Sequence, residues 1–571
     1  MLARKVDVII LNYPRLAPRD FPGGRLVSEL FLNQRRLDIQ PGATLFDAAD
    51  LLGLKLPSSC GRHGSCHECI IQVTAGEEAL NPRTENEDFL RGGYRLACQC
   101  RLERPEPVVH AHALRRGTPQ IAASGRPVPV ALAPAVTRGP DDTVLLDGEP
   151  IAQRRGPLLG AAADIGTTTV VLRLVDLETG QIVAAQSFEN PQMFGGGDVM
   201  GRITYDRETK RRDLQQVLVA YLNRSLGEFC EALGAETDDI YEFVAVGNAT
   251  MRDLLFGYDV QTIGVKPFMS VSEIEFREGQ RETTALACRP TRLRLAINRK
   301  GRVWGAPLIA CHVGADTAAC VAAVDVERAA RPVIIMDIGT NTELVVGHGE
   351  RVLCASCPAG PAFEGARVTW GMPGLEGAIE SVRLENGQVD YRVIGDAAPA
   401  GICGSGMIDA LGELLRTGRM NMLGRLEDGD GRFLIAEAAG IYLSNKDISE
   451  LAQAKGANIA GILILLRELG LTLEEVDRFY LAGGFAQYID IEHAIRIGML
   501  PRMPVEKFEK LGNAAIEGAT ALLCSTDLRR RLDAYVHRIG HVELENHPAF
   551  FGYYVEGMQF KASDEMAPAG V

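Results

Sequence analysis

Three features are scarce or missing in this 571-residue sequence, and each absence excludes a class of protein. Lys and Arg (60 residues) are outnumbered by Asp and Glu (74), and the net charge of −14 argues against nucleic-acid or anionic-membrane partners. No apolar run reaches the length of a membrane span, and the longest early run, VDVIIL, is too short for a signal-peptide core. We therefore expect a cytoplasmic protein with no membrane and no nucleic-acid partner.

Dense cysteine clusters are also rare, and the single exception is the stretch SSCGRHGSCHEC. Cys60, Cys66 and Cys69 follow the spacing C-x5-C-x2-C, and the segment RLACQC adds Cys98 and Cys100 further along. Cytoplasmic thiols stay reduced, so such a cluster more often binds metal than forms disulfides. Four thiolates, three from one loop and one from a distant strand, suit a [2Fe–2S] cluster.

The segments around these cysteines predict a small α+β ferredoxin-like domain of the β-grasp type. An alternating strand and a hairpin precede the loop from Leu26 onward, and Thr44 is placed to cap a helix reaching Leu54. The alternating strand IIQVTAG follows the loop. Gly61 and Gly64 would let the backbone wrap closely around the inorganic sulfides.

The fourth ligand is assigned by resemblance. The spacing resembles that of adrenodoxin-like [2Fe–2S] ferredoxins, and RLACQ matches their last-ligand motif, which implies Cys98. Cys100 is the alternative ligand. Structural zinc is the alternative metal, although zinc sites usually show two C-x2-4-C pairs. His63 and His67 also lie in the loop and are expected to face solvent.

The second part of the chain repeats a motif. AAADIGTTTVV and IIMDIGTNTEL are both apolar strands that end in Asp-Ile-Gly-Thr, followed by a tight turn and further strands. Such turns can point backbone N–H groups at phosphate oxygens, and Asp164 and Asp337 are placed to hold Mg²⁺ through water. The candidate phosphate contacts are Gly166, Thr167, Thr168, Gly339, Thr340 and Asn341. We expect the two hairpins to grip the phosphates of ATP from both sides of a cleft.

This duplication resembles the superfamily of acetate and sugar kinases, heat-shock chaperones and actin, which implies an α/β actin-like ATPase. In that superfamily an acidic residue at the connecting helix orients water, which implies Asp316, although a helix N-cap is the alternative reading. A glycine-rich helix start and a late Gly-Gly turn complete the pattern. These candidate nucleotide contacts are Gly404, Ser405, Gly406, Gly483 and Gly484.

The length of the chain is too great for one core, and composition divides it into segments. We expect an N-terminal extension (1–25), the ferredoxin domain (26–112), a Pro/Gly-rich linker (113–158), the ATPase (159–560) and a disordered tail (561–571). A short hairpin around TVLLDGEPI is expected inside the linker. The second half of the ATPase should begin near residue 331.

The whole arrangement is similar to the reductive activators of corrinoid-dependent methyltransferases and corrinoid iron–sulfur proteins. The resemblance rests on SCGRHGSCHEC, RLACQ, DIGTTTV, NPQMFGGGDVMGRI, VGNATM, MDIGTNTEL, GPAFEGA, GICGSGMID and LAGGFAQYID. It implies ATP-hydrolysing transfer of one electron to a Co(II) corrinoid, a corrinoid protein or methyltransferase as partner, a low-potential electron donor and a homodimer. Members often carry a longer middle domain before the first phosphate motif, whereas this chain has a short Pro-rich bridge there.

Two other functions fit parts of the sequence. One is the activator of 2-hydroxyacyl-CoA dehydratases, which shares the ATPase fold but has no ferredoxin domain. The other is a redox switch in which nucleotide only controls docking. ATP turnover measured with and without a corrinoid protein separates the switch from an activator.

Overall fold

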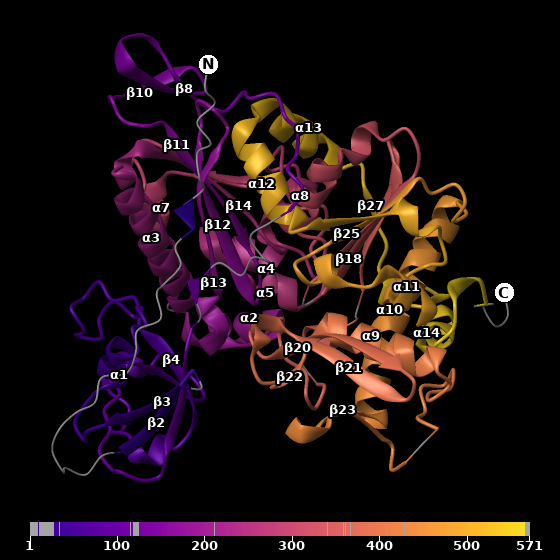
Figure 1. Ribbon diagram of the computed structural model, residues 1–571. Helices are drawn as coiled ribbons and strands as arrows, with labels where there is room; N and C mark the ends of the chain where they lie inside the picture. The colour runs from indigo at the N-terminus through magenta and orange to yellow at the C-terminus, as the bar shows by residue number, and fades with distance from the viewer. Residues whose placement is uncertain are drawn as a thin grey trace, which may run out of the picture. The chain divides into compact units, whose positions relative to one another are not determined.

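The structure is a computed structural model, and its elements can be followed by label and colour in Figure 1. It describes residues 9–10, 28–33, 35–114, 116–117, 125–210, 212–339, 341–357, 359, 361–365, 367–427 and 429–565. Most of the expected N-terminal extension and tail, and Thr340, lie outside the described residues. The chain forms two structural units. One comprises residues up to 118, 131–306 and 522–526, and the other comprises 119–130, 307–521 and 527 onward.

The cysteine segment folds as a five-stranded sheet in the order β3-β2-β6-β4-β5 beside a short helix. Its elements are β2 (Ser28–Leu32), β3 (Arg35–Ile39), α1 (Leu45–Leu51), β4 (Ile70–Ala75), β5 (Tyr94–Leu96) and β6 (Val109–Ala113). The central strands β2 and β6 are parallel, and the others pair antiparallel. Thr44 caps α1 as expected, through a capping box with Asp47, but the helix ends at Leu51 and not at Leu54. This is the predicted β-grasp fold.

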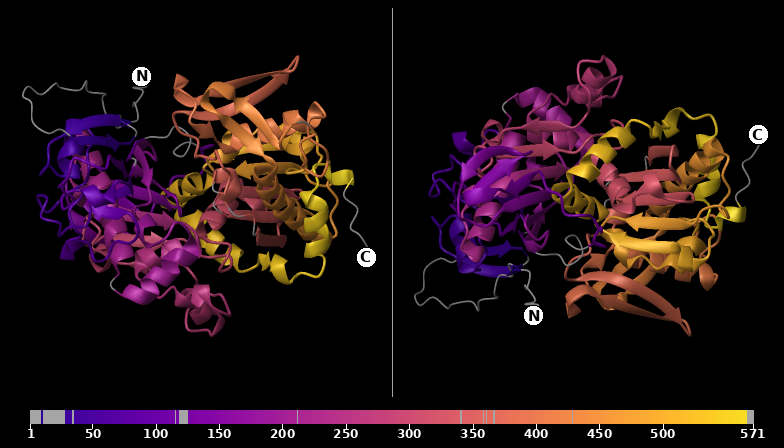
Figure 2. Two further views of the ribbon diagram at one scale, coloured as in Figure 1. Left: turned by 90° about the horizontal axis from the view of Figure 1, so that it is seen from below. Right: turned by 90° about the horizontal axis from the view of Figure 1, so that it is seen from above.

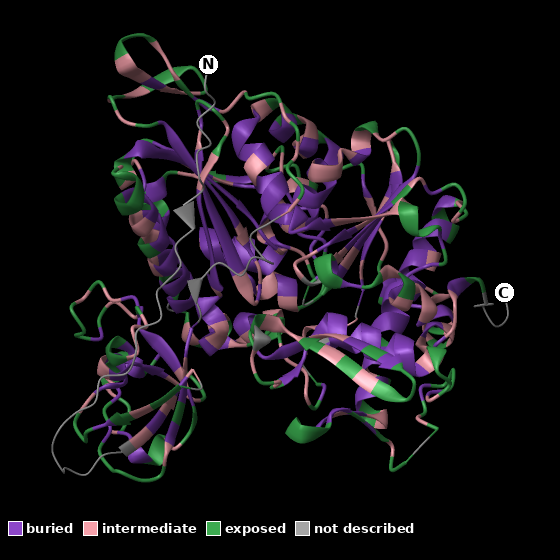
Figure 3. Cartoon of the chain, viewed as in Figure 1, coloured by how far each residue is buried: buried purple, intermediate pink, exposed green. Residues whose placement is uncertain are grey.

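The first half of the expected ATPase region is built on an eight-stranded sheet that includes β11 (Leu159–Ile165), β12 (Thr169–Asp176), β13 (Ile182–Glu189) and β14 (Ile240–Val246). β11 pairs antiparallel with β12 and parallel with β14. The central strands are almost entirely buried, as the purple ribbons of Figure 3 show. The first phosphate turn lies where β11 ends.

The second half repeats this arrangement in a six-stranded sheet of the order β26-β25-β17-β18-β19-β27. Its inner strands are β17 (Val333–Ile338), β18 (Thr342–His348), β19 (Arg351–Cys357) and β25 (Arg478–Ala482). β17 pairs antiparallel with β18 and parallel with β25, just as β11 does with its neighbours. The long helix α10 (Asn445–Leu469) packs beside β18 and β19 (Figures 1 and 2). The predicted duplication is therefore present in the fold.

The expected linker and tail contain more structure than the sequence suggested. β8 (Val136–Arg138), β9 (Thr143–Leu146) and β10 (Glu149–Gln153) form a three-stranded antiparallel sheet, so the expected hairpin has a third strand. In the tail, Ser563 Oγ accepts a hydrogen bond from the Arg502 amide at 2.9 Å. No helix in the described part of the chain is both long enough and apolar enough to cross a bilayer.

Candidate functional site

The cysteine loop brings four thiols together. Cys69 Sγ lies 3.3 Å from Cys98 Sγ, and the thiols of Cys60 and Cys66 are hydrogen-bonded to each other. Burial opposes ionisation of Cys60, but the amides of Cys66, His63 and Ser65 outweigh it and lower the pKa of Cys60 to about 6. Backbone N–H groups aimed at a sulfur are the setting that a thiolate ligand of an iron–sulfur cluster requires.

Cys98 fits the ligand set better than Cys100. The hydrogen bond from Cys69 is the largest influence on Cys98 and lowers its pKa to about 7, while the Gln99 amide lies 3.5 Å from its sulfur. Cys100 is fully buried, and this burial raises its pKa to about 12. The geometry thus favours Cys98 as fourth ligand, and the assignment remains a prediction.

The loop around the thiols is tight enough to need glycine. Gly64 has φ +84°, and a Cβ there would lie 2.9 Å from side-chain atoms of both Asn86 and Gln99. Of the two loop histidines, His63 is exposed as expected. The expectation was wrong for His67, which is half-buried and stacks on Phe89 with ring centroids 4.1 Å apart. The donor set and the close wrap both fit a [2Fe–2S] cluster.

The first phosphate loop is held by three polar side chains from motifs that follow it. Asn190 Nδ2 donates to the Gly166 carbonyl at 2.8 Å, and Asn248 Nδ2 donates to Thr167 Oγ1 at 3.0 Å. Arg202 Nη2 donates to the Thr167 carbonyl at 2.5 Å. These residues come from NPQMFGGGDVMGRI and VGNATM, whose support of the phosphate loop was not recognised from the sequence.

The second phosphate loop carries a carboxylate that the sequence reasoning missed. In the hairpin of β17 and β18, Asp337 lies directly opposite Glu343, and Asp316 from helix α8 (Ala315–Val324) interacts electrostatically with Glu343. Counting back across the three-residue turn would have paired Asp337 with Glu343. In the first half, Asp164 faces Val171 instead. The acidic pair Asp337 and Glu343 therefore has no counterpart at the matching positions of the first hairpin, and with Asp316 it forms an acidic trio.

These carboxyl groups resist ionisation in the absence of a cation. Desolvation raises the pKa of Asp337 to about 6, even though Cys320 Sγ donates a hydrogen bond to it at 3.5 Å. Desolvation, followed by the charges of Asp316 and Asp337, raises the pKa of Glu343 well above its usual value. A divalent cation would relieve both effects, so the trio fits Mg²⁺.

Asp316 is not a helix cap. The N-cap of α8 is Gly314, and Asp316 lies in the first turn, where its Oδ1 accepts from the Thr317 amide at 2.8 Å. The capping alternative is therefore wrong for this residue. Its assignment to water positioning remains a prediction.

The two glycine motifs have clear packing reasons. Gly483 has φ +98°, and a Cβ there would lie 2.3 Å from the Ile338 carbonyl oxygen and 3.3 Å from Asp337 Oδ1. At the start of α9 (Gly404–Arg416), a Cβ on Gly406 would lie 2.3 Å from the Ile379 carbonyl oxygen. Ser405 is buried and donates to the Glu380 carbonyl at 2.8 Å. Contact of these residues with nucleotide remains a prediction.

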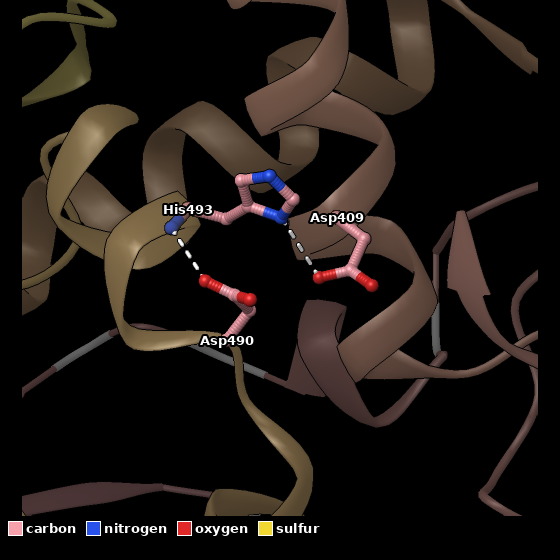
Figure 4. A group of neighbouring side chains, drawn as sticks. All are labelled: Asp409, Asp490 and His493. Carbon is pink, nitrogen blue, oxygen red and sulfur yellow. Dashed lines mark hydrogen bonds and ion pairs between the residues drawn. The ribbon is translucent and has the colours of Figure 1, made fainter. Parts of the chain in front are cut away.

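A polar cavity of about 760 Å³ opens beside helix α9. It is lined by residues that include Glu380, Asp409, Glu413, Asp490, His493 and Lys510. Figure 4 shows His493, from α11 (Ile491–Arg496), beside Asp409 and Asp490. Its Nδ1 lies 3.0 Å from Asp409 Oδ1, and its backbone amide donates to Asp490 Oδ1 at 3.0 Å. The sequence reasoning missed this cavity, although the i, i+4 pair Asp409 and Glu413 on α9 was a visible signal.

The imidazole in this cavity is held by carboxylates on both ring nitrogens. His493 Nε2 lies 3.2 Å from Glu413 Oε1. Burial lowers the pKa of His493, but the hydrogen bond and charge of Asp409 raise it more. Asp409, Asp490 and His493 have donor atoms close enough to share a metal ion. Both ring nitrogens of His493 are already in contact with carboxylates, so the cavity suits a polar organic ligand better than a metal.

Comparisons with known proteins match three segments of the chain. A family model described as the C-terminal domain of RACo, the ASKHA domain, matches residues 331–569, and one described as the RACo middle region matches 159–329. A model of the 2Fe–2S iron–sulfur cluster binding domain matches 31–103. The chain belongs to the RACo family of reductive activators of corrinoid proteins. The family's middle region is thus present here, and it coincides with the first half of the ATPase.

Individual relatives and a solved structure support this membership. The chain is 29% identical to the corrinoid activation enzyme RamQ of Eubacterium limosum, over 93% of this chain and 98% of that protein. It is 24% identical to a Co(II) methylated amine-specific corrinoid protein reductase of Methanosarcina barkeri, over 72% of this chain and 79% of that protein. A solved reductive activator for a corrinoid iron–sulfur protein is 26% identical, with a TM-score of 0.66 over 95% of this chain and all of that one.

Proposed function

We propose that this RACo-family chain is an ATP-dependent reductive activator that returns the Co(II) corrinoid of a partner protein to Co(I). One observation carries the proposal. A ferredoxin-type thiol cradle and a duplicated phosphate hairpin with an acidic trio occur in a single chain of this family. The presence of the ferredoxin domain favours this function over that of a 2-hydroxyacyl-CoA dehydratase activator.

The thiols of Cys60, Cys66, Cys69 and Cys98 would hold the [2Fe–2S] cluster, which supplies one-electron transfer when bound. The chain's contribution is to set the environment of the sulfurs. Amides from the loop donate to Cys60, and Gln99 donates to Cys98. Such hydrogen bonds stabilise negative charge on sulfur and so influence the reduction potential.

ATP would be gripped by both phosphate hairpins. Asp164 and Asp337 stand at the strand ends, and Asp337 with Glu343 would hold Mg²⁺ in the second hairpin. Asp316, from the first turn of α8, would orient the attacking water. The nucleoside would enter the cavity beside α9, where Asp409 can accept hydrogen bonds from ribose hydroxyls or the adenine amino group.

The partner and assembly follow from the same proposal. A corrinoid protein or a corrinoid-dependent methyltransferase would receive the electron, and a low-potential donor would refill the cluster. A homodimer is the expected assembly. ATP hydrolysis would be coupled to electron delivery, because Co(II) corrinoids are reduced only at very low potential and a tenfold uphill shift of a one-electron step costs about 59 mV.

The test follows the visible spectrum of a Co(II) corrinoid protein under anaerobic conditions with excess low-potential reductant. The full-length protein with Mg-ATP should produce Co(I) or methylated corrinoid. Cys98→Ser and Glu343→Gln should each slow the conversion about 100-fold or more. Cys100→Ser and Glu350→Gln, the second at an exposed hairpin turn, are the matched controls. Equal rates with and without ATP in the unmodified protein would refute the coupling.

A further inference from the structure

Helix α2 (Val199–Thr209) contacts two parts of the first unit that lie far apart in the sequence. Arg202 is fully buried, and its Nη2 donates to the Thr167 carbonyl of the first phosphate loop. Tyr205 follows one turn later on the same helix face, and its hydroxyl donates to the Phe89 carbonyl of the ferredoxin domain at 2.6 Å. One helix therefore holds both the phosphate loop and the ferredoxin domain.

Aromatic contacts extend from α2 to the cysteine loop. Phe89 meets Phe194 edge to face with ring centroids 5.2 Å apart, and Phe194 meets Tyr205 in the same way at 5.4 Å. Phe89 also stacks on His67, which lies between Cys66 and Cys69 along the chain. The cysteine loop is thus connected to α2 through a continuous series of rings.

The ferredoxin segment that carries Phe89 is internally rigid. Glu87 is fully buried and accepts hydrogen bonds from Arg95 Nε and from the Leu96 amide, both at 2.9 Å. Charge-assisted bonds of this kind fix a loop in one position. A movement at α2 would therefore displace the ferredoxin domain as a body and not only one loop.

The remaining contacts across this surface are weak enough to be reversible. Arg91 lies over the Tyr205 ring at 4.7 Å and pairs with Glu208 at 2.6 Å, where the two side chains are 43% and 50% exposed. On a neighbouring strand, His112 Nε2 lies 3.3 Å from Glu189 Oε2. Ion pairs with this exposure contribute little to stability. The contact therefore depends mainly on Tyr205 and the aromatic rings beside it.

The Tyr205 hydroxyl has a second acceptor available when the contact opens. Its oxygen is also 3.2 Å from Asp213 Oδ2, within the ATPase half of the unit. A phenol carries one proton and can donate to only one acceptor at a time. When the Phe89 carbonyl leaves, the proton can turn to Asp213, so no buried hydroxyl is left unsatisfied. The site accommodates both a docked and an undocked ferredoxin domain.

We propose that α2 is a docking helix for the chain's own ferredoxin domain, and that nucleotide at the first phosphate loop releases this domain. The inference rests on the proposed function because it needs ATP at Thr167 and Thr168. Phosphate binding shifts the first phosphate loop. Because Arg202 on α2 is hydrogen-bonded to this loop, α2 moves with it, and the contacts of Tyr205 with the ferredoxin domain break. Release uncovers the His67 side of the cysteine loop, from which an electron can reach a partner protein.

Hydrogen exchange of the full-length protein, read by mass spectrometry, tests the docking surface without nucleotide. Tyr205→Phe removes the shared proton and should raise exchange of residues 85–93 about fivefold or more, the lower end of common coupling between sites. Glu208→Arg should have the same effect, and adding Arg91→Glu should restore protection. Arg207→Gln, an exposed neighbour on α2, is the control. Unchanged exchange in both Tyr205→Phe and Glu208→Arg would refute the proposal that α2 is a docking surface for the ferredoxin domain.

A second arm tests the coupling with a non-hydrolysable ATP analogue and Mg²⁺, while nucleotide affinity is measured in parallel by calorimetry. In the unmodified protein the analogue should raise exchange of residues 85–93 to the level of Tyr205→Phe. Arg202→Lys should bind the analogue but show no such rise. Nucleotide binding without any change in exchange would refute the coupling alone, whereas failure of the unmodified protein to bind nucleotide would refute the proposed ATP site.

Discussion

Asp337→Asn should make the metal-free protein more stable and at the same time inactive. The pKa of Asp337 is raised from 3.8 to about 6, mainly by desolvation. A shift of about two units corresponds to about 3 kcal/mol by which the charged carboxylate destabilises the folded state. Because the folded pKa is the higher one, this cost is absent below about pH 4 and complete above about pH 6. Asparagine carries no charge and avoids it.

The assay is thermal unfolding in the presence of EDTA at about pH 5 and about pH 8. Asp337→Asn should unfold at a higher temperature than the unmodified protein at the higher pH, and the gain should shrink at the lower pH. Glu350→Gln, an exposed acid in the turn between β18 and β19, should change stability by less than about 0.5 kcal/mol at both. An asparagine variant that is no more stable at about pH 8, or equally stabilised at both, would show that Asp337 is not a desolvated carboxylate.

Three further outcomes follow from the same sites. Cys98→Ser should lose the two irons per chain and the red-brown colour while Cys100→Ser keeps them; iron analysis that finds zinc alone in anaerobically prepared protein would contradict this. Mg-nucleotide binding should release protons and weaken as pH falls below about 6, because metal ligands must be ionised. Calorimetry in buffers of different ionisation enthalpy measures the release, which should decrease in Glu343→Gln. His493→Asn should weaken ATP binding without changing the iron content. An unchanged nucleotide affinity would show that the cavity lined by His493 does not bind ATP.

Sequence reasoning succeeded where spacing alone defines geometry. Local sequence patterns were enough to predict three features. These are the helix cap at Thr44, the β-grasp strand order and the paired hairpins after Asp164 and Asp337. Cys98 was separable from Cys100 only by resemblance. The structure adds a geometric reason, because the Cys98 sulfur lies 3.3 Å from the Cys69 sulfur.

The residues that were missed depend on contacts between distant segments. Arg202 and Asn248 lie far along the chain from the loop they hold, and nothing local indicates that their side chains turn toward Thr167. His67 has polar neighbours in sequence, which suggested solvent, yet Phe89 covers it. Glu343 is different, since the register of a three-residue hairpin places it opposite Asp337 and could have been counted from the sequence.

The two phosphate hairpins have the same strand pairing but differ in the side chains that they carry. Val171 faces Asp164 in the first, where the loop is fixed by hydrogen bonds from behind, including that of the buried Arg202. Glu343 faces Asp337 in the second, where carboxylates repel one another until a cation binds. The second hairpin is therefore suited to metal-assisted hydrolysis. The first hairpin is suited to changing its conformation when nucleotide binds. This division agrees with the proposed role of α2, because the helix that contacts the ferredoxin domain is attached to the first loop and not to the hairpin that carries the carboxylates.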